Sequence, residues 1–301
     1  MDARALVADL APVCVFVMMS CIGLDLVPAQ FRALLRSPKP LLVGIAGQLA
    51  VAPAAGFALA AVFAGQPAVA LAMILVVAAP GGPVANGFVF LGRGRPDVSV
   101  SLTATNGVLS LVSTPLIVHL GFEWFGGTEV SIALPVAETI RKILLMAVLP
   151  IFLGMLLRRA AGGRAEVARR WARRLAGLML ATVLALVFAA SADVLAEHWR
   201  TMLPGAFLLC VAMFAATTAV AGLAGLDRPM RMTIATEVGV HNVPLAVVMA
   251  QTLLARPELT AFIVLYAPAV ALVALAWALH HRRIAARMPS PGWPAQGEGR
   301  R

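Results

Sequence analysis

Long apolar runs recur along the whole chain, separated by short polar segments that are rich in arginine. A run of about 20 apolar residues can cross a hydrocarbon core of about 30 Å as a helix. The pattern predicts about nine transmembrane helices, with bounds near 5–28, 40–64, 68–91, 97–120, 136–157, 175–195, 201–224, 229–252 and 259–280. We therefore expect an all-α polytopic membrane protein in which residues 1–287 form a single unit. The remaining tail, 288–301, is rich in proline and glycine and is expected to be disordered on the cytoplasmic side.

Composition supports a membrane protein and excludes other classes. Of the 301 residues, 61% are hydrophobic and 13% are charged, whereas a soluble domain carries roughly 25% charged residues. The net charge of +10 does not indicate a nucleic-acid partner, because the basic residues lie in short loops between apolar runs. Cys14, Cys21 and Cys210 lie within apolar runs without metal-ligand spacing. No HExxH or GxSxG motif occurs, so we do not expect an enzyme.

The positions of the basic residues predict how the chain is oriented. With the N-terminus outside and the C-terminus in the cytoplasm, 19 of the 24 lysines and arginines fall on the cytoplasmic side, as the positive-inside rule requires. We expect the inner membrane of a bacterium, and a first run that is a retained helix rather than a cleaved signal. The strongly basic segment 158–174 is predicted to be a cytoplasmic linker between two halves, with a lipid-headgroup or regulatory site as the alternative.

Two of the predicted helices carry a break near their centres. The third run contains Pro-Gly-Gly-Pro at residues 80–83, and the eighth contains Glu-Val-Gly-Val-His-Asn-Val-Pro at residues 237–244. Proline removes a backbone donor and glycine permits unusual dihedral angles. The two runs would cross the membrane in opposite directions, as an inverted repeat requires. Paired breaks of this kind indicate the midplane site of a transporter, with ordinary kinks relieved by neighbouring helices as the alternative.

Polar side chains lie near both breaks. Glu237 is central in the eighth run, where an unpaired carboxylate needs a cation or a proton. Ser99 and Thr103 are four residues apart, so their hydroxyls share one helix face. Asn86 follows the first break, and Gln48 lies midway along the second run. Such oxygens suit a hard cation, although each alone is more often a contact between helices.

At these residues the chain resembles the bile acid:sodium symporter family, over roughly residues 12–285. The resemblance rests on GLDLVPAQF, SPKPLLVGIAGQLAVAP, PGGPVANGFVFLGRGRPDVSVSLTATN and TEVGVHN. It implies a nine-helix member with a panel domain and a core domain, in which two discontinuous helices cross. The panel helices would be those near 5–28, 136–157 and 175–195, and the core helices would lie within 40–120 and 201–280.

The resemblance also implies which residues bind ions and substrate. One sodium site would use Asn86, Ser99, Thr103 and Glu237. The second would use Gln48, Glu237 and the backbone carbonyls of Val238 and Val240, with His241 at a position where the family normally has glutamine. The family usually has a serine where this chain has Ala85. Substrate would bind near the crossing, at Asn242 and the backbone around Pro83 and Val84.

The implied function is symport of a small organic anion with Na⁺, by alternating access around a midplane site, without any other cofactor. The departures at Ala85 and His241 keep proton coupling open, in which case Glu237 and His241 would form a proton relay in a carrier or exporter on the same fold. A channel or a non-transporting receptor is a third possibility, because broken helices also suit a selectivity filter. We expect membrane lipid around the protein, and both a monomer and a homodimer stay open.

Overall fold

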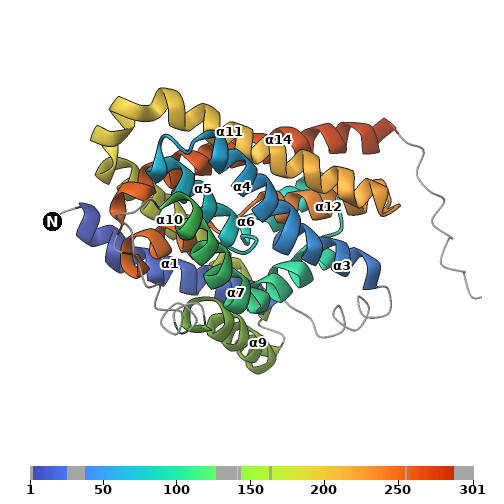
Figure 1. The fold of residues 1–301 in the computed structure, drawn as a ribbon. Coiled ribbons are helices and arrows are strands. Elements are labelled where there is room, and N and C mark those ends of the chain that lie inside the picture. The colour runs from blue at the N-terminus through green and yellow to red at the C-terminus, as the bar shows by residue number, and fades with distance from the viewer. Residues whose placement is uncertain are drawn as a thin grey trace, which may run out of the picture.

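A computed structural model describes residues 3–25, 38–126, 141, 144–162, 165–254 and 256–287 (Figure 1). The predicted all-α fold is confirmed, because every regular element in these ranges is helical. In chain order the α-helices are α1 (Ala3–Asp25), α3 (Pro38–Ala46), α4 (Ala52–Val62), α5 (Pro67–Ala78), α6 (Val84–Leu91), α7 (Pro96–Phe125), α9 (Leu149–Ala161), α10 (Ala165–Ala190), α11 (Ala192–Leu223), α12 (Arg228–Gly239), α13 (Val243–Val248) and α14 (Thr260–Arg287). Short π-helices at Gly47–Val51, Leu144–Val148 and Met249–Leu253 and a 3₁₀ turn at Pro257–Leu259 complete the order.

Six of the described helices are long and apolar enough to cross a membrane. They are Pro38–Val62, Pro96–Phe125, Leu144–Ala161, Arg169–Ala190, Ala192–Leu223 and Thr260–Ala286. Shorter apolar helices run over Asp9–Leu24 and Pro67–Ala78. Apolar side chains also cover much of the outside: Phe90 is 77% exposed and Leu223 is 89% exposed. Such a surface suits lipid rather than water. The count of nine spans stays a prediction.

The broken helices lie in the interior of the molecule. Every residue of α5 from Val69 to Ala78 is buried, and so is every residue of α13. A helix that is apolar on all sides is expected to be surrounded by others, and α5 packs against α4 and α7. The long helices α11 and α14 run side by side along one edge (Figure 1). The center of the fold is therefore built around the segments that sequence marks as interrupted.

Helices α1, α9 and α10 form a second packing group. α1 contacts both α9 and α10, and α9 lies next to it at the lower edge in Figure 1. The approach of α1 to α9 is close because Gly23 and Gly154 face each other: a Cβ on Gly23 would lie 2.0 Å from the Ile151 carbonyl oxygen. Small residues allow such backbone contact between membrane helices. The division of the chain into panel and core stays a prediction.

Two predicted boundaries are wrong. The segment 158–174, expected to be a linker, is largely helical: α9 continues to Ala161 and α10 begins at Ala165. The reason is local, since alanine, arginine and glutamate are strong helix formers, and only the region around Gly162, with a φ of 50°, interrupts them. α11 likewise begins at Ala192 instead of 201. The tail 288–301 and the predicted start of the span near 136–157 lie outside the described residues.

Candidate functional site

The two predicted interruptions are true breaks in the helices, and they contact each other. The first break covers residues 79–83 and the second covers 240–242. The backbones pair in an antiparallel bridge between Gly81 and His241. The amide of Gly82 donates to the Val240 carbonyl at 2.8 Å, and the amide of Asn242 donates to the Pro80 carbonyl at 2.9 Å. Each break thus satisfies backbone groups that the other has left without a helical partner.

Gly81 and Gly82 serve close approach rather than an unusual backbone angle. Neither is among the glycines with positive φ in the described chain. A Cβ on Gly81 would lie 2.8 Å from Oε1 of Glu237, and one on Gly82 would lie 2.9 Å from the His241 carbonyl oxygen. Real Cβ atoms do not come this near to oxygen. The expected use of these glycines for unusual dihedral angles is therefore wrong at this break.

A fully buried carboxylate lies where the breaks meet. Glu237 has no exposed surface. The hydroxyl of Ser99 donates to its Oε2 at 2.7 Å, and the hydroxyl of Thr103 donates to its Oε1. Both hydroxyls come from one face of α7, in agreement with their spacing. No basic side chain forms an ion pair with Glu237 in the described residues. A buried carboxylate in this situation needs a cation or a proton.

Two amide side chains are fixed to the first break and keep one oxygen unpaired. Gln48, within the π-helix Gly47–Val51, donates from Nε2 to the Ala79 carbonyl at 3.2 Å. Asn86 donates from Nδ2 to the Pro83 carbonyl at 3.3 Å. Oε1 of Gln48 and Oδ1 of Asn86 are buried and have no hydrogen-bond partner in the part of the chain that the structure describes. Buried unpaired carbonyl oxygens need an explanation, and a hard cation is one ligand they suit.

The second break fixes His241 and Asn242. Asn242 caps α13, accepting the amide of Leu245 on Oδ1 at 3.1 Å. His241 does not continue the face of Glu237, because the helix ends between them. Its Nδ1 instead lies 3.5 Å from the hydroxyl of Tyr266, which donates to the Gly239 carbonyl at 2.9 Å. Nε2 of His241 and Nδ2 of Asn242 are buried and lack a hydrogen-bond partner among the residues described.

The backbone groups expected to bind an ion lie at the same junction. The carbonyl of Val240 already accepts the amide of Gly82, which leaves one of its two lone pairs. Val238 is buried, and its side chain packs at Gly47, next to Thr217. The hydroxyl of Thr217 is buried and has no hydrogen-bond partner within the described ranges. Thr217 was not predicted from the sequence, because a lone threonine in an apolar run carries no signal.

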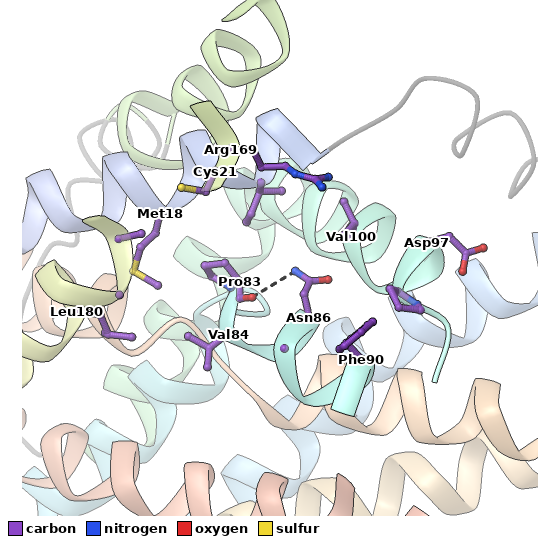
Figure 2. A pocket seen from close by; sticks show the side chains of 15 residues that line it. Met18, Cys21, Pro83, Val84, Asn86, Phe90, Asp97, Val100, Arg169 and Leu180 are labelled. Carbon is purple, nitrogen blue, oxygen red and sulfur yellow. Dashed lines mark hydrogen bonds between the residues drawn. The ribbon is translucent and has the colours of Figure 1, made fainter. Parts of the chain in front are cut away.

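A cavity of about 560 Å³ opens beside the first break. Figure 2 shows α6 and α7 on one side and α1 and α10 on the other. Pro83 and Val84, two of the three predicted substrate contacts, line it, whereas Asn242 is not among its lining residues. Most of the wall is apolar, including Met18, Phe90 and Leu180.

One basic side chain enters this cavity. Arg169 of α10 faces Asn86 across it in Figure 2, and Asp97 lies at its rim. Arg169 forms an ion pair with Glu166, one turn earlier on the same helix, at 2.5 Å. The sequence did not mark Arg169 because its segment was expected to be a linker. The cavity therefore combines an apolar wall with a guanidinium group.

The site and fold agree with comparisons to known proteins. The profile of the Sodium Bile acid symporter family matches residues 12–198, more than half of the chain. The chain belongs to this family, which comprises sodium-dependent transporters rather than enzymes. It is an integral multi-pass membrane protein. The resemblance seen in the sequence is confirmed.

Curated relatives cover most of the chain at low identity. The "Uncharacterized sodium-dependent transporter YocS" of Bacillus subtilis is 26% identical over 241 residues, covering 78% of this chain and 71% of its own. The mouse "Sodium-dependent organic anion transporter" is 27% identical over 255 residues, covering 83% and 66%. The rabbit "Ileal sodium/bile acid cotransporter" is 23% identical over 246 residues, covering 80% and 69%. The chain thus spans about two thirds of the length of these relatives.

Proposed function

We propose that this protein is a sodium-coupled symporter of a small organic anion. Nine helices would cross the inner membrane of a bacterium, with the N-terminus outside and the C-terminus in the cytoplasm. The two broken helices would cross at the midplane within a core domain, and a panel of the helices near 5–28, 136–157 and 175–195 would move relative to it. The names of the relatives support both the coupling ion and the anionic substrate. The symporter description of the family supports a carrier over a channel or receptor.

Glu237 is the observation that carries the proposal. A carboxylate with no exposed surface, and with no basic partner among the described residues, is stable as an anion only beside a cation. Ser99 and Thr103 bring hydroxyl oxygens to it, and Asn86 would complete one sodium site. Gln48, Glu237 and the carbonyls of Val238 and Val240 would form the second, with His241 beside them. Oxygen ligands of this kind are those that hard cations prefer.

The cavity supports the choice of an anionic substrate. It reaches Pro83 and Val84 at the first break, so a bound molecule would lie near the ion sites. Arg169, which also pairs with Glu166, brings a planar guanidinium to the cavity, and such a group can hold a carboxylate through two parallel hydrogen bonds. The apolar remainder of the wall suits a hydrocarbon body attached to that anion. Asn242 would contact substrate from the second break in another stage of the cycle.

Thermal stability of the detergent-purified protein in sodium, against potassium or choline at equal ionic strength, tests the coupling ion. A ligand that binds only the folded state raises its melting temperature by mass action. We expect a sodium-specific rise that is lost in Glu237→Ala and weakened in Ser99→Ala. Ser101→Ala is the matched control, because Ser101 is equally buried on α7 but donates to the Asp97 carbonyl of its own helix. Equal stability in all three salts would contradict sodium binding.

Proton coupling is the second candidate, favoured by the unpaired Nε2 of buried His241 and its neighbour Tyr266. A glutamine would offer an oxygen at this position, whereas imidazole is a proton carrier. If the protein is proton-coupled, uptake of the organic anion into proteoliposomes should be independent of sodium and should be driven by an imposed pH gradient. It should be lost in His241→Gln. Uptake that needs sodium and is unaffected by His241→Gln would exclude it.

A further inference from the structure

The turn after α6 holds an arginine in a backbone conformation that favours glycine. Arg93 has a φ of 58°, and it is the one non-glycine residue with positive φ in the described chain. The amide of Gly94 donates to the Val89 carbonyl at 2.9 Å, and the amide of Arg93 donates to the Phe90 carbonyl at 3.2 Å. This pair of bonds is a Schellman motif, in which the left-handed position is usually occupied by glycine. An L-residue with a Cβ is strained there.

The two glycines beside Arg93 are required for another purpose. A Cβ on Gly92 would lie 2.1 Å from Cε of Met232, and one on Gly94 would lie 2.6 Å from Oγ1 of Thr233. Gly92 and Gly94 therefore allow the turn to press against α12. Arg93, between them, is exposed, and no described residue forms an ion pair or hydrogen bond with its side chain. A strained residue whose side chain has no partner among the described residues points to a function for that side chain.

Arg93 shares a pocket with a second arginine from a distant part of the chain. The pocket has a volume of about 440 Å³ and is lined by Arg93, Arg282 of α14, and the neighbouring Phe90, Leu91, Gly94 and Pro96. Arg282 is also exposed and has no ion-pair partner among the described side chains. Arg95 of the same turn differs, because it pairs with Asp97 at 3.2 Å. Two guanidinium groups in one pocket, neither with an acidic partner among the described residues, form a site for an anion with several oxygens, such as a phosphate.

The apolar residues of this pocket indicate whether it suits a soluble phosphate or a phospholipid. Phe90 is 77% exposed and belongs to this pocket's wall, as does Leu91. A soluble phosphate makes no use of an exposed aromatic ring, whereas a phospholipid carries its phosphate directly above hydrocarbon. Basic pockets at the ends of membrane helices are recognised sites for anionic headgroups.

We propose that the pocket of Arg93 and Arg282 binds the phosphodiester headgroup of an anionic phospholipid, with an acyl chain along Phe90. The pocket shares Phe90 and Pro96 with the cavity beside the first break, but its two arginines do not line that cavity and Glu237 does not line the pocket. The proposal therefore stands whether or not the protein is coupled to sodium. It also gives a reason for an arginine at a position where glycine would relax the backbone.

The test measures how strongly different lipids bind to the full-length protein in maltoside micelles. Native mass spectrometry counts bound dioleoylphosphatidylglycerol, with dioleoylphosphatidylcholine as the neutral lipid and glycerol 3-phosphate as the soluble phosphate. We expect phosphatidylglycerol to bind in preference to phosphatidylcholine, and glycerol 3-phosphate not to compete at millimolar concentration. Arg93→Gln and Arg282→Gln should each weaken phosphatidylglycerol binding about fivefold, the factor that corresponds to about 1 kcal/mol per arginine at a lipid surface.

Two variants separate a headgroup site from general surface charge and from a structural role. Arg283→Gln removes the same charge one residue along α14, outside the pocket, and should leave binding within about twofold of wild type. Arg93→Gly should raise the melting temperature without added lipid, because it relieves the left-handed position, and should weaken phosphatidylglycerol binding as Arg93→Gln does. Equal losses in Arg283→Gln and Arg282→Gln, no preference for phosphatidylglycerol, effective competition by glycerol 3-phosphate, or a lowered melting temperature in Arg93→Gly would each overturn the proposal.

Discussion

The hydroxyls of Ser99 and Thr103 can take two roles toward Glu237. As hydrogen-bond donors they stabilise the carboxylate in the conformation described. The same oxygens carry lone pairs, so with a cation present they can rotate their protons away and become ligands. These two hydroxyls therefore have a partner both with and without an ion. A valine in place of Thr103 would preserve shape but remove this exchange.

The side chain of Arg169 is expected to contribute to binding of the anionic substrate. Arg169→Gln should weaken binding of an organic carboxylate about three- to tenfold, a modest factor because the side chain is partly exposed and its charge is screened. Arg170→Gln, the next residue and outside the cavity lining, is the matched control and should change binding little. Cholate and 4-phenylbutyrate serve as carboxylate probes and 4-phenylbutyramide as the uncharged one, with binding followed by calorimetry.

The uncharged probe 4-phenylbutyramide should bind to wild type and to Arg169→Gln with the same affinity. If Arg169→Gln weakens binding of 4-phenylbutyramide as much as binding of the two carboxylates, Arg169 shapes the cavity wall and does not hold the anion. The sodium-dependent stabilisation should survive in Arg169→Gln, since this residue is not at Glu237. That result separates a failure of the anion assignment from a failure of sodium coupling.

At the scale of elements, the two breaks hold the functional site together. Each lacks helical partners for its own amides and carbonyls, and each supplies some of those that the other needs. The close fit depends on Gly81, beside which the Glu237 carboxylate packs. The breaks are thus one structural feature made from two segments.

Gly81→Ala tests this fit. The added methyl would overlap Oε1 and the backbone oxygen of Glu237, and overpacking of this kind costs about 1–3 kcal/mol of stability. Gly87→Ala is the control: Gly87 lies in α6 with nothing within 4 Å of its added Cβ, so it should be neutral or stabilise by about 0.5–1 kcal/mol. Melting temperatures in detergent measure both. A Gly81→Ala protein as stable as Gly87→Ala would contradict the close contact.

The positions of the two breaks could be predicted from the sequence, but the groups that contact each break could not. Proline and glycine mark the ends of α5 and α12 by local chemistry, and the four-residue spacing of Ser99 and Thr103 places both on one face. His241 was expected beside Glu237 from the family resemblance, and nothing in the sequence indicated that its ring would lie next to Tyr266 instead, because that contact joins residues far apart in the chain. Arg169 was missed for a different reason: the many arginines of 158–174 suggested a loop, although their helix propensity is high.

At the scale of the whole molecule, the orientation in the membrane is the prediction to test. The proposed topology puts Arg170 in the cytoplasm and Arg200 outside, and both are exposed. Single cysteines at these positions, in a background with Cys14, Cys21 and Cys210 replaced by serine or alanine, should react with a membrane-impermeant maleimide from opposite sides. Intact cells should label only the cysteine at position 200. Labelling of both positions in intact cells would reject the nine-span, N-outside arrangement.

The pairing of the two breaks also has a consequence for how the protein is made. The backbone of residues 80–82 reaches its partners only when residues 240–242 have left the ribosome. At 5–20 residues per second this takes on the order of ten seconds. Throughout that interval the Gly82 amide and the Pro80 carbonyl lack the partners that the second break supplies, which is costly in an apolar medium. We therefore expect the inserted first half to need shelter from the translocon or another insertion factor until the second break is made.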